Sequence, residues 1–437
     1  MQLGNALPSI RHPIPSAAGR SWVERLAASE CPALTTRRKR RAELTGASHD
    51  PIVWVQAQGA NVIDSDGNRY VDFTSGFGVA FVGHRHPEVV EAVKRQADRL
   101  LHALGDLHPS DVKIQLLEKL CTRAPWPKAR AMLSLSGADA VTAALKTAVM
   151  ATAKTGVVAF EGSYHGLNYG PLAVSGFAKR FREPFLAQLQ SDVHFAAWPS
   201  PDLGVEAALK TLPKDWSRIG AVIVEPIQGR AGVRFPPLGF LEALGQACKK
   251  NGALLIVDEI LTGVGRCGAW WRSVDEGLIP DLVCAGKALG GGLPVSACIG
   301  REDVMRAWGD PDREAIHTGT FFGDPLGSAA ALATIELIER DELAQRAVDR
   351  GKTFATMLRA ERLPSVTGVR QAGMMLGLQL EGSMQALRVS RSLLERGYLV
   401  LPAGAEADVI QLTPPVTVND EQLEGFVASL RASLGGR

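Results

Sequence analysis

The stretch at residues 281–294, DLVCAGKALGGGLP, places a single lysine, Lys287, among apolar residues and glycines. An ammonium group is costly in an apolar setting unless the amine is neutralised, paired or used covalently. The run DLVCAG has the composition of a buried strand, so Lys287 is expected just beyond the end of that strand. The lysine is therefore a candidate for chemistry at the edge of a sheet.

The segments around this stretch alternate between strands and helices. Short apolar runs occur at AMLSLS, VVAF, AVIVEP and ALLIVDE, and amphipathic segments such as GFLEALGQACKKNG lie between them. Near-continuous Val, Ile and Leu runs between helices predict a largely parallel sheet that is covered on both faces. The expected fold is α/β, with a large doubly wound, mostly parallel sheet domain and a smaller α+β domain. Ligands of such sheets gather at the carboxyl ends of the strands.

The pattern differs towards the two ends of the chain. VWVQAQGANVIDSDGNRYVDF predicts a β-meander, and after about residue 326 a long helix leads into shorter strands and helices. We expect residues 1–75 to form an N-terminal segment of the small domain. Residues 76–328 are expected to form the large domain, and residues 329–437 the C-terminal part of the small domain.

Composition and charge fit a globular protein and argue against a dedicated nucleic-acid-binding protein. The 437 residues are 46% hydrophobic, which is enough for a substantial core. The 48 lysines and arginines nearly balance the 46 aspartates and glutamates, and a net charge of +2 argues against a dedicated nucleic-acid-binding protein. One basic run, RRKRR at residues 37–41, fits either a polyanion-binding or targeting patch or a solvated surface segment.

The sequence also bears on the compartment. No apolar run reaches the roughly 18 to 20 residues that a membrane-spanning helix needs, so no membrane partner is expected. The N-terminal segment lacks the apolar core of a secretory signal. The six cysteines include no CxxC pair, so they signal neither a zinc site nor a redox pair, and they indicate a reducing, cytoplasmic compartment.

Three features at the expected strand ends point to one site. ALLIVDE ends near Asp258, about one strand-and-crossover unit before Lys287, so a carboxylate and an amine are expected at the same edge of the sheet. Alone, these two groups could form a structural ion pair. The turn SGA at residues 136–138 joins a strand to a helix, and it fits either a phosphate site or simple helix capping by its serine.

An amine, a carboxylate and an anion-binding helix start are together what pyridoxal 5′-phosphate (PLP) requires. The aldehyde needs a lysine to form a Schiff base, the ring nitrogen needs a carboxylate that keeps it protonated, and the phosphate needs N–H groups. We therefore expect PLP as the cofactor, with Lys287 as the Schiff-base residue. The apolar surroundings would help keep its amine nucleophilic by lowering its pKa. No metal is expected.

The chain resembles the class III aminotransferases, PLP enzymes of fold type I that include the 4-aminobutyrate and acetylornithine aminotransferases. The resemblance extends from about residue 50 to the C-terminus and depends on eight motifs in the family's order. These are DGNRYVDFTSGFGVAFVGHRHP, SGADAVTAALK, FEGSYHG, VIVEPIQG, LLIVDEILTGVGRCG, AGKALGGGLP, HTGTFFGDPLGSAAALA and LTPPVTV. The resemblance implies a PLP-dependent transaminase, in which Lys287 also moves the proton and Asp258 pairs with the ring nitrogen.

The resemblance assigns further residues to the cofactor. Ile260 would pack on one face of the ring, and Tyr164 on the other. Gly137 and Ala138, next to Ser136, would offer N–H groups to the phosphate. Because Ala138 stands where serine or threonine is common, one hydroxyl contact would be missing.

Other residues would shape the pocket and the assembly. Thr320 in GTFFGDP resembles the threonine that reaches the phosphate from the neighbouring subunit, which implies a homodimer. Glu225 resembles the family's pocket glutamate. The residues expected to line the substrate pocket are Phe77, Gln228, Arg230 and Gln411.

Two departures from the family bear on the substrate. Leu167 stands where the 4-aminobutyrate and acetylornithine enzymes have an arginine that grips a carboxylate, and Gln411 replaces a second carboxylate-binding arginine. Neither side chain can replace a bidentate arginine. We therefore expect either another base for the carboxylate, first of all Arg230, or a less acidic substrate pair. The donor would be an amine, an ω-amino compound or an amino acid, and the acceptor an oxo compound.

Two other functions stay open at this stage. An isomerase of the same family, either an aminomutase or an amino-acid racemase, would begin with the same proton removal but need no external acceptor. A non-catalytic nucleotide-binding or scaffold protein could use the same kind of sheet. The presence of both Lys287 and Asp258 argues against this second alternative.

Overall fold

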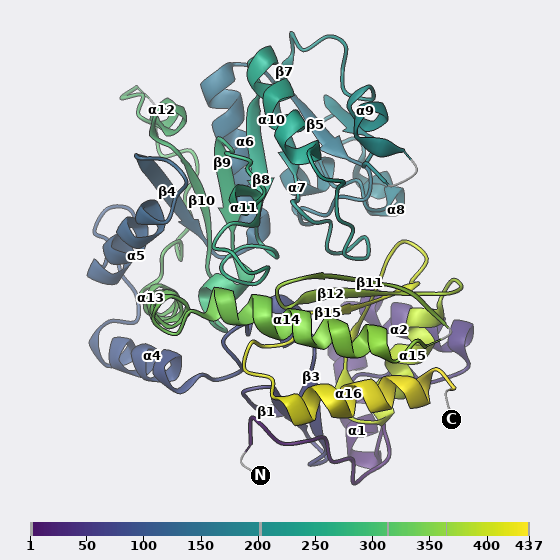
Figure 1. The fold of residues 1–437 in the computed structure, drawn as a ribbon. Helices are drawn as coiled ribbons and strands as arrows, with labels where there is room; N and C mark the ends of the chain where they lie inside the picture. Colours follow the sequence, from purple (N-terminus) through teal and green to yellow (C-terminus); the bar gives the residue numbers. More distant parts are fainter. Residues whose placement is uncertain (1–2, 201–202, 313, 364, 436–437) are drawn as a thin grey trace. The chain divides into compact units, whose positions relative to one another are not determined.

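The computed structural model describes residues 3–200, 203–312, 314–363 and 365–435 (Figure 1). The chain forms two compact units. The small unit consists of residues 1–86 and 348–437, and the large unit consists of residues 87–347.

A seven-stranded sheet with the order β4-β10-β9-β8-β7-β5-β6 lies at the centre of the large unit. The neighbours from β9 to β6 pair in parallel, and β10 runs antiparallel to both β9 and β4. The mostly parallel sheet that the apolar runs predict is therefore confirmed. The strands are β4 (Ala129–Ser134), β5 (Gly156–Phe160), β6 (Val193–Ala196), β7 (Ile219–Val224), β8 (Leu254–Asp258), β9 (Leu282–Ala285) and β10 (Ser296–Arg301).

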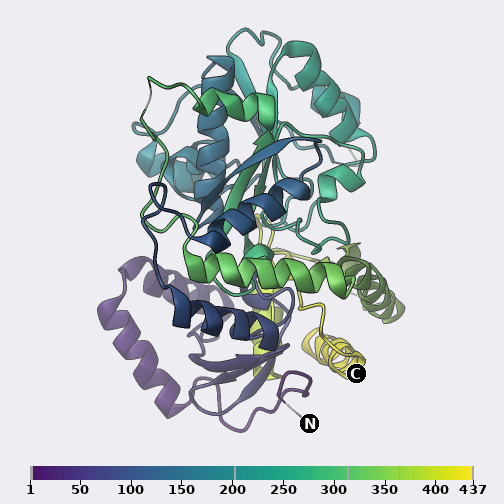
Figure 2. The same ribbon diagram turned by 90° about the vertical axis from the view of Figure 1, so that its left-hand side faces the viewer.

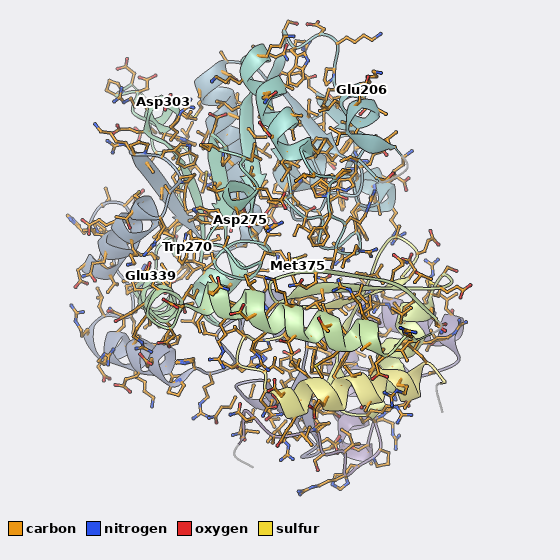
Figure 3. All side chains as sticks on the ribbon, viewed as in Figure 1. Glu206, Trp270, Asp275, Asp303, Glu339 and Met375 are labelled. Carbon is orange, nitrogen blue, oxygen red and sulfur yellow. The ribbon has the colours of Figure 1, made fainter. Side chains whose placement is uncertain are left out.

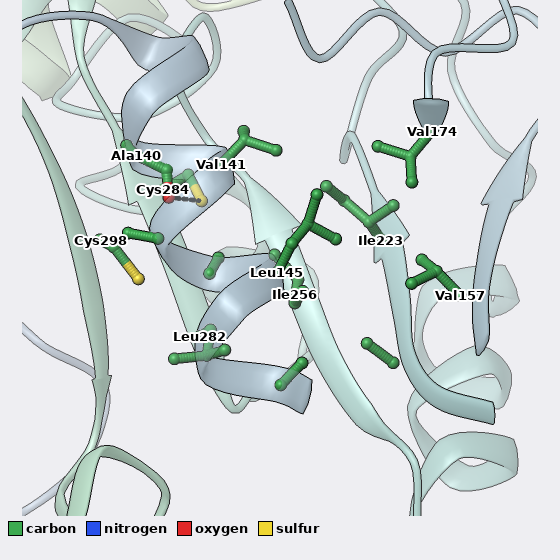
Figure 4. Close-up of a cluster of buried hydrophobic side chains, with 14 of the residues drawn as sticks. Ala140, Val141, Leu145, Val157, Val174, Ile223, Ile256, Leu282, Cys284 and Cys298 are labelled. Atoms are coloured by element: carbon green, nitrogen blue, oxygen red, sulfur yellow. Dashed lines mark hydrogen bonds between the residues drawn. The ribbon is translucent and has the colours of Figure 1, made fainter. Parts of the chain in front are cut away.

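Helices cover both faces of this sheet. Side chains alternate between the two faces along a strand, so Ile223 of β7 lies on the opposite face from Val222 and Val224. Figure 4 shows the first face, where α6 (Gly137–Thr152) packs its small apolar residues on Ile223 and its neighbours. On the second face, Phe240 and other residues of α10 (Phe240–Asn251) pack with Val222 and Val224. Two buried cores result, one on each face.

Three further helices of the large unit pack together (Figure 2): α4 (Pro87–Arg99), α5 (Asp111–Thr122) and α13 (Pro325–Arg340). The Glu339 carboxylate of α13 accepts a hydrogen bond from Lys119 Nζ of α5 at 2.7 Å and forms an ion pair of 2.5 Å with Arg123, the residue after α5. Arg123 also lies over the ring of Trp270, 5.6 Å from its centroid, and Figure 3 labels Trp270 and Glu339. These contacts hold α13 in the large unit, so the unit boundary falls after residue 347, whereas the expected domain boundary follows residue 328.

The shorter elements of the large unit connect the strands and helices. They are α7 (Tyr169–Ala173), α8 (Lys179–Arg182), α9 (Gly204–Leu209), α11 (Arg272–Asp275), α12 (Glu302–Met305) and the 3₁₀ turns η1 (Glu183–Phe185), η2 (Lys287–Gly290) and η3 (Arg306–Trp308).

The small unit contains two four-stranded sheets with the orders β1-β2-β3-β13 and β11-β12-β15-β14. Its core includes an aromatic cluster in which the Phe73 ring stacks on Phe426 with centroids 4.4 Å apart. Its strands are β1 (Trp54–Gln58), β2 (Asn61–Asp64), β3 (Arg69–Asp72), β11 (Val366–Ala372), β12 (Met375–Leu380), β13 (Tyr398–Leu399), β14 (Leu401–Ala403) and β15 (Val409–Leu412). Its helices are α1 (Ala17–Ser29), α2 (Pro32–Thr45), α3 (Ser75–Gly78), α15 (Gln385–Glu395) and α16 (Asp420–Ser433), and α14 (Leu343–Ala360) crosses the unit boundary.

The segment up to residue 86 stays with the small unit because His84 is tied to it. His84 Nε2 hydrogen-bonds to Asp72 Oδ2 at 2.8 Å, and the backbones of Gly59 and His84 exchange two hydrogen bonds of 2.8 Å. The N-terminal unit boundary therefore follows residue 86, whereas the expected domain boundary follows residue 75.

The basic run at residues 37–41 lies on α2, none of whose residues is buried. Arg38 pairs with Glu30 at 2.6 Å, whereas Arg37, Lys39 and Arg40 are exposed. This placement agrees with a surface segment and leaves polyanion binding as a separate possibility. None of the helices in the described ranges combines the length and the apolar character that crossing a membrane would require.

Candidate active site

The site is built on the carboxyl ends of adjacent parallel strands. Asp258 ends β8, and Glu225 directly follows β7. Tyr164 follows β5, and Lys287 follows β9 after one intervening residue. In the sheet these four strands are neighbours in the order β9-β8-β7-β5, so the four side chains come from one edge.

Asp258 and His165 form a buried pair at this edge. His165 Nδ1 lies 2.8 Å from Asp258 Oδ2, and the backbone N–H of Ile260 donates to Asp258 Oδ1 at 3.1 Å. His165 Nε2 is buried and has no hydrogen-bond partner among the described residues. The pairing fixes the orientation of the Asp258 carboxylate, which keeps lone pairs for a further donor.

The Glu225 carboxylate is buried and links two loops. Tyr164 N donates to its Oε1 at 2.9 Å, and Gly229 N donates to its Oε2 at 3.2 Å. Burial raises the pKa of Glu225 to about 7, and the charge of Asp258 adds to the rise, while His165 and the two N–H groups oppose it. The group therefore titrates near neutral pH.

Lys287 begins the 3₁₀ turn η2 with a backbone φ of +44°. A left-handed conformation is uncommon for a residue that has a side chain, and such strain is concentrated at functional sites. Burial lowers the pKa of the Lys287 amine, and the charges of Asp258 and Glu225 act in the opposite direction. Within the described ranges, the Lys287 amine makes no hydrogen bond or ion pair.

The start of α6 packs against Ile260, two residues after Asp258. The Ser136 side chain accepts a hydrogen bond from Asp139 N at 3.2 Å, so it caps the helix. Helix capping was one of the two interpretations of the SGA turn. Gly137 and Ala138 are the first helical residues, and their N–H groups precede the first intrahelical hydrogen bonds. A Cβ on Gly137 would lie 2.6 Å from Ile260 Cδ1, so the lack of a side chain lets Ile260 pack against the helix start.

Several predicted pocket residues have structural partners. Gln228 is buried, donates to Glu161 O at 2.9 Å and accepts Arg234 at 3.4 Å, so its amide holds neighbouring loops together. Arg230 lies over the ring of Tyr164, with its Cζ 4.8 Å from the centroid. Thr320 is exposed on its own chain.

Phe77 and Gln411 belong to the small unit. Phe77 is 65% exposed, and its φ of +64° follows the left-handed Gly76. Ser75 Oγ donates to Thr413 O at 2.6 Å, so this strained turn is tied to the segment after β15. Gln411 is buried within β15.

Phe177, which packs beside Arg230 and Tyr164, was not among the residues predicted from the sequence. Its ring lies 5.1 Å from Arg230 Cζ and packs edge-on against Tyr164, with centroids 6.5 Å apart. Nothing in the local sequence SGFAK distinguishes this aromatic residue from an ordinary surface phenylalanine.

Comparison with known proteins agrees with this geometry. The chain belongs to the class III aminotransferases, because the model of that family, aminotransferase class-III, matches residues 45–434. It is 38% identical to the acetylornithine aminotransferase of Methanopyrus kandleri, over 89% of this chain and 95% of that protein. It is 37% identical to that of Mycolicibacterium smegmatis, over 88% and 94% of the two chains.

Solved structures give the same result. A PLP-bound amine transaminase from an uncultivated Pseudomonas species has a TM-score of 0.81 at 27% identity, covering 88% of this chain and 95% of that one. The ornithine aminotransferase from Toxoplasma gondii has a TM-score of 0.80 at 27% identity, covering 95% and 97%. The protein is therefore a PLP-dependent transaminase of fold type I, and the family, the fold class and the cofactor expected from the sequence are confirmed.

Proposed function

We propose that this transaminase transfers an amino group from an amine, an ω-amino compound or an amino acid to an oxo acceptor, and that Lys287 is the residue that holds PLP covalently. The observation that carries this assignment is the Lys287 amine, which makes no hydrogen bond or ion pair with the residues that the structure describes, at the sheet edge that also bears Asp258. The names of the relatives, acetylornithine and ornithine aminotransferases, and of the amine transaminase support a donor of this kind.

The residues at the edge fit the three parts of PLP. The low-pKa amine of Lys287 suits the aldehyde, and the oriented carboxylate of Asp258 suits a protonated ring nitrogen. The N–H groups of Gly137 and Ala138, at the positive end of the α6 dipole, suit the phosphate. Bound there, PLP would supply the electron sink for breaking a bond at the carbon that carries the amine.

The chain's own groups would then hold the cofactor and move the proton. Lys287 Nζ would take the proton from the substrate carbon and return it as a general acid. His165 would keep the Asp258 carboxylate aimed at the ring nitrogen. Ile260 and Tyr164 would enclose the ring from its two faces, and Glu225 would fix the Tyr164 backbone.

The proposed homodimer is supported by an apolar surface of the large unit. Residues 100–107 and 316–321 carry exposed side chains, among them Leu101, Leu104, Leu107 and Phe321. The His102 ring contacts Phe321 at 5.2 Å between centroids, which joins the two segments into one surface. Burial of such a patch against a second copy would present the exposed Thr320 to the partner's phosphate site. We also place the enzyme in the cytoplasm, because all six cysteines are free thiols.

Covalent trapping tests the assignment of Lys287. The protein is incubated with PLP and reduced with borohydride, and its peptides are analysed by mass spectrometry. We expect the label on Lys287, and we expect Lys287→Ala to lose both the label and turnover while keeping its circular dichroism spectrum. A label on another lysine, or normal turnover by Lys287→Ala, would refute the proposed chemistry.

The same-family isomerase is separated by a second assay. An aminomutase or racemase converts a single substrate in the absence of any oxo compound, because the amino group never leaves the active site. A transaminase stops after one turnover under those conditions and resumes when an oxo acid is added. Continued conversion without an acceptor would favour the isomerase.

A further inference from the structure

Arg230 occupies a corner formed by two aromatic rings. It lies in a hairpin in which the backbones of Gln228 and Arg234 exchange two hydrogen bonds of 3.0 Å. Its Cζ is 4.8 Å from the centroid of the Tyr164 ring and 5.1 Å from that of Phe177, and the two rings are perpendicular. Cation–π attraction to both rings therefore restricts where the guanidinium can lie.

The Arg230 corner is tied to the candidate cofactor site through one carboxylate. Glu225 accepts the backbone N–H of Tyr164 and that of Gly229, the residue before Arg230. The same carboxylate acts electrostatically on the amine of Lys287. Glu225 thus fixes the backbone of Tyr164, whose ring Arg230 covers, and the turn that carries Arg230.

The other arginines of this region have different surroundings. Arg182 packs over Phe195 at 4.1 Å, Arg234 donates to Gln228, and Arg180 is exposed beside Phe181. Leu167, three residues after Tyr164, is uncharged and 50% exposed. Of these four arginines, Arg230 is the one that contacts Tyr164.

We propose that Arg230 is the anion-binding residue of the substrate pocket and that the enzyme exchanges amino groups between carboxylate-bearing substrates. This inference is built on the proposed function, because it names the class of substrate that the same site takes. Donor and acceptor bind to a transaminase in turn, so one cation can serve the carboxylates of both. The donor is then an ω-amino acid or an amino acid, and the acceptor an oxo acid.

The aromatic corner suits a guanidinium better than an ammonium for this role. The two rings restrict the guanidinium, whose planar fork can offer a carboxylate two parallel N–H donors where an ammonium offers only a point charge. Because the rings restrict the side chain beforehand, less conformational entropy is lost when the carboxylate binds. A charge-assisted pair of this kind is expected to change affinity about 10- to 100-fold.

The test compares Arg230→Gln with the parent enzyme loaded with PLP. Calorimetry measures the binding of glutarate, a carboxylate that has neither an amine nor an oxo group. Spectroscopy of the cofactor measures single-turnover amino transfer from 4-aminobutyrate and, separately, from benzylamine, which has no carboxylate. We expect glutarate affinity and the 4-aminobutyrate reaction to fall about 10- to 100-fold, and the benzylamine reaction to change by less than about twofold.

Two further variants keep the result interpretable if Arg230→Gln folds poorly. Arg230→Lys keeps the charge without the planar fork and should give intermediate glutarate affinity. Arg180→Gln removes an exposed arginine that lies on a neighbouring ring, and it should leave glutarate binding unchanged. Scanning calorimetry identifies any variant whose unfolding temperature has fallen.

The outcomes separate this inference from the proposed function. If the parent enzyme transfers amino groups but Arg230→Gln binds glutarate as well as the parent, or loses all donors equally, the anion site is refuted and the transaminase assignment stands. If the parent enzyme binds glutarate through Arg230 but transfers no amino group, the anion site stands and the proposed function fails.

Discussion

Substitution of Glu225 by glutamine should make the stability of the protein depend less on pH. The parent carboxyl has its pKa raised to about 7 by burial, against 4.5 in the unfolded chain. Between these values the folded state holds a proton that the unfolded state releases, so the parent loses stability as pH rises through this window. At 1.36 kcal/mol for each pH unit, the full loss is about 3 kcal/mol, most of which falls between pH 5 and pH 8.

Glutamine at this position is neutral at every pH, but it cannot accept both N–H groups. One carbonyl oxygen replaces two carboxylate oxygens, so either Tyr164 N or Gly229 N would face an NH₂ group. A buried donor left without an acceptor costs about 1 to 3 kcal/mol. We therefore expect Glu225→Gln to be less stable than the parent near pH 5, and the difference to shrink by about 2 to 3 kcal/mol by pH 8.

Urea unfolding of the cofactor-free protein, at a fixed protein concentration and at several pH values, measures this difference. Glu118→Gln on α5 is the matched control, because Glu118 is exposed. Its substitution should change the free energy of unfolding by the same amount at every pH. Parallel pH profiles for the parent and Glu225→Gln would refute the reasoning. They would mean that the carboxyl titrates at the same pH in the folded and unfolded chains.

Two other predictions concern the Lys287 turn and the assembly. Gly291 has a φ of +59°, and a Cβ there would lie 2.1 Å from Thr334 Oγ1 of α13, so Gly291→Ala should cost about 2 to 4 kcal/mol in the free energy of unfolding. Adding Thr334→Ala removes the clash but not the backbone strain, so denaturant unfolding of the double variant should show partial recovery, and no recovery would contradict a steric cause. If the apolar surface of residues 100–107 and 316–321 joins two copies, Leu104→Glu should shift the mass measured by light scattering from dimer to monomer. Leu238→Glu, at an exposed site of another loop, should leave the mass unchanged, and an unchanged mass for Leu104→Glu would exclude this surface.

The strand ends could be predicted from the sequence because apolar runs define them directly. ALLIVDE and DLVCAG each fill a buried parallel strand, so the residues that follow, Asp258 and Lys287, had to reach the same edge. The antiparallel direction of β10 was not predicted, although a signal exists. The connection from β9 to β10 holds only Gly286, the turn η2 and residues 291–295, which is too short for a parallel crossover.

Side-chain contacts between distant loops could not be predicted in the same way. The corner around Arg230 joins residues from three loops, and neither Phe177 nor Tyr164 has a local pattern that marks it as a cation's neighbour. Gln228 shows the converse case. Its position beside Glu225 in the sequence suggested the substrate pocket, but its amide is buried and engaged by Glu161 and Arg234.

If Lys287 and Asp258 hold the cofactor as proposed, the arrangement also explains how one chain can have these two residues without the arginines that the family resemblance implies at positions 167 and 411. Lys287 and Asp258 are positioned by buried strands of a packed sheet, where even small changes of volume disturb the core. Arg230 is positioned by a hairpin loop, and loops tolerate substitution far better than the elements they connect. A carboxylate-binding arginine can therefore lie on the hairpin, in place of one at position 167 or 411, without any change at the strand ends. This holds as long as Glu225 keeps the hairpin against Tyr164.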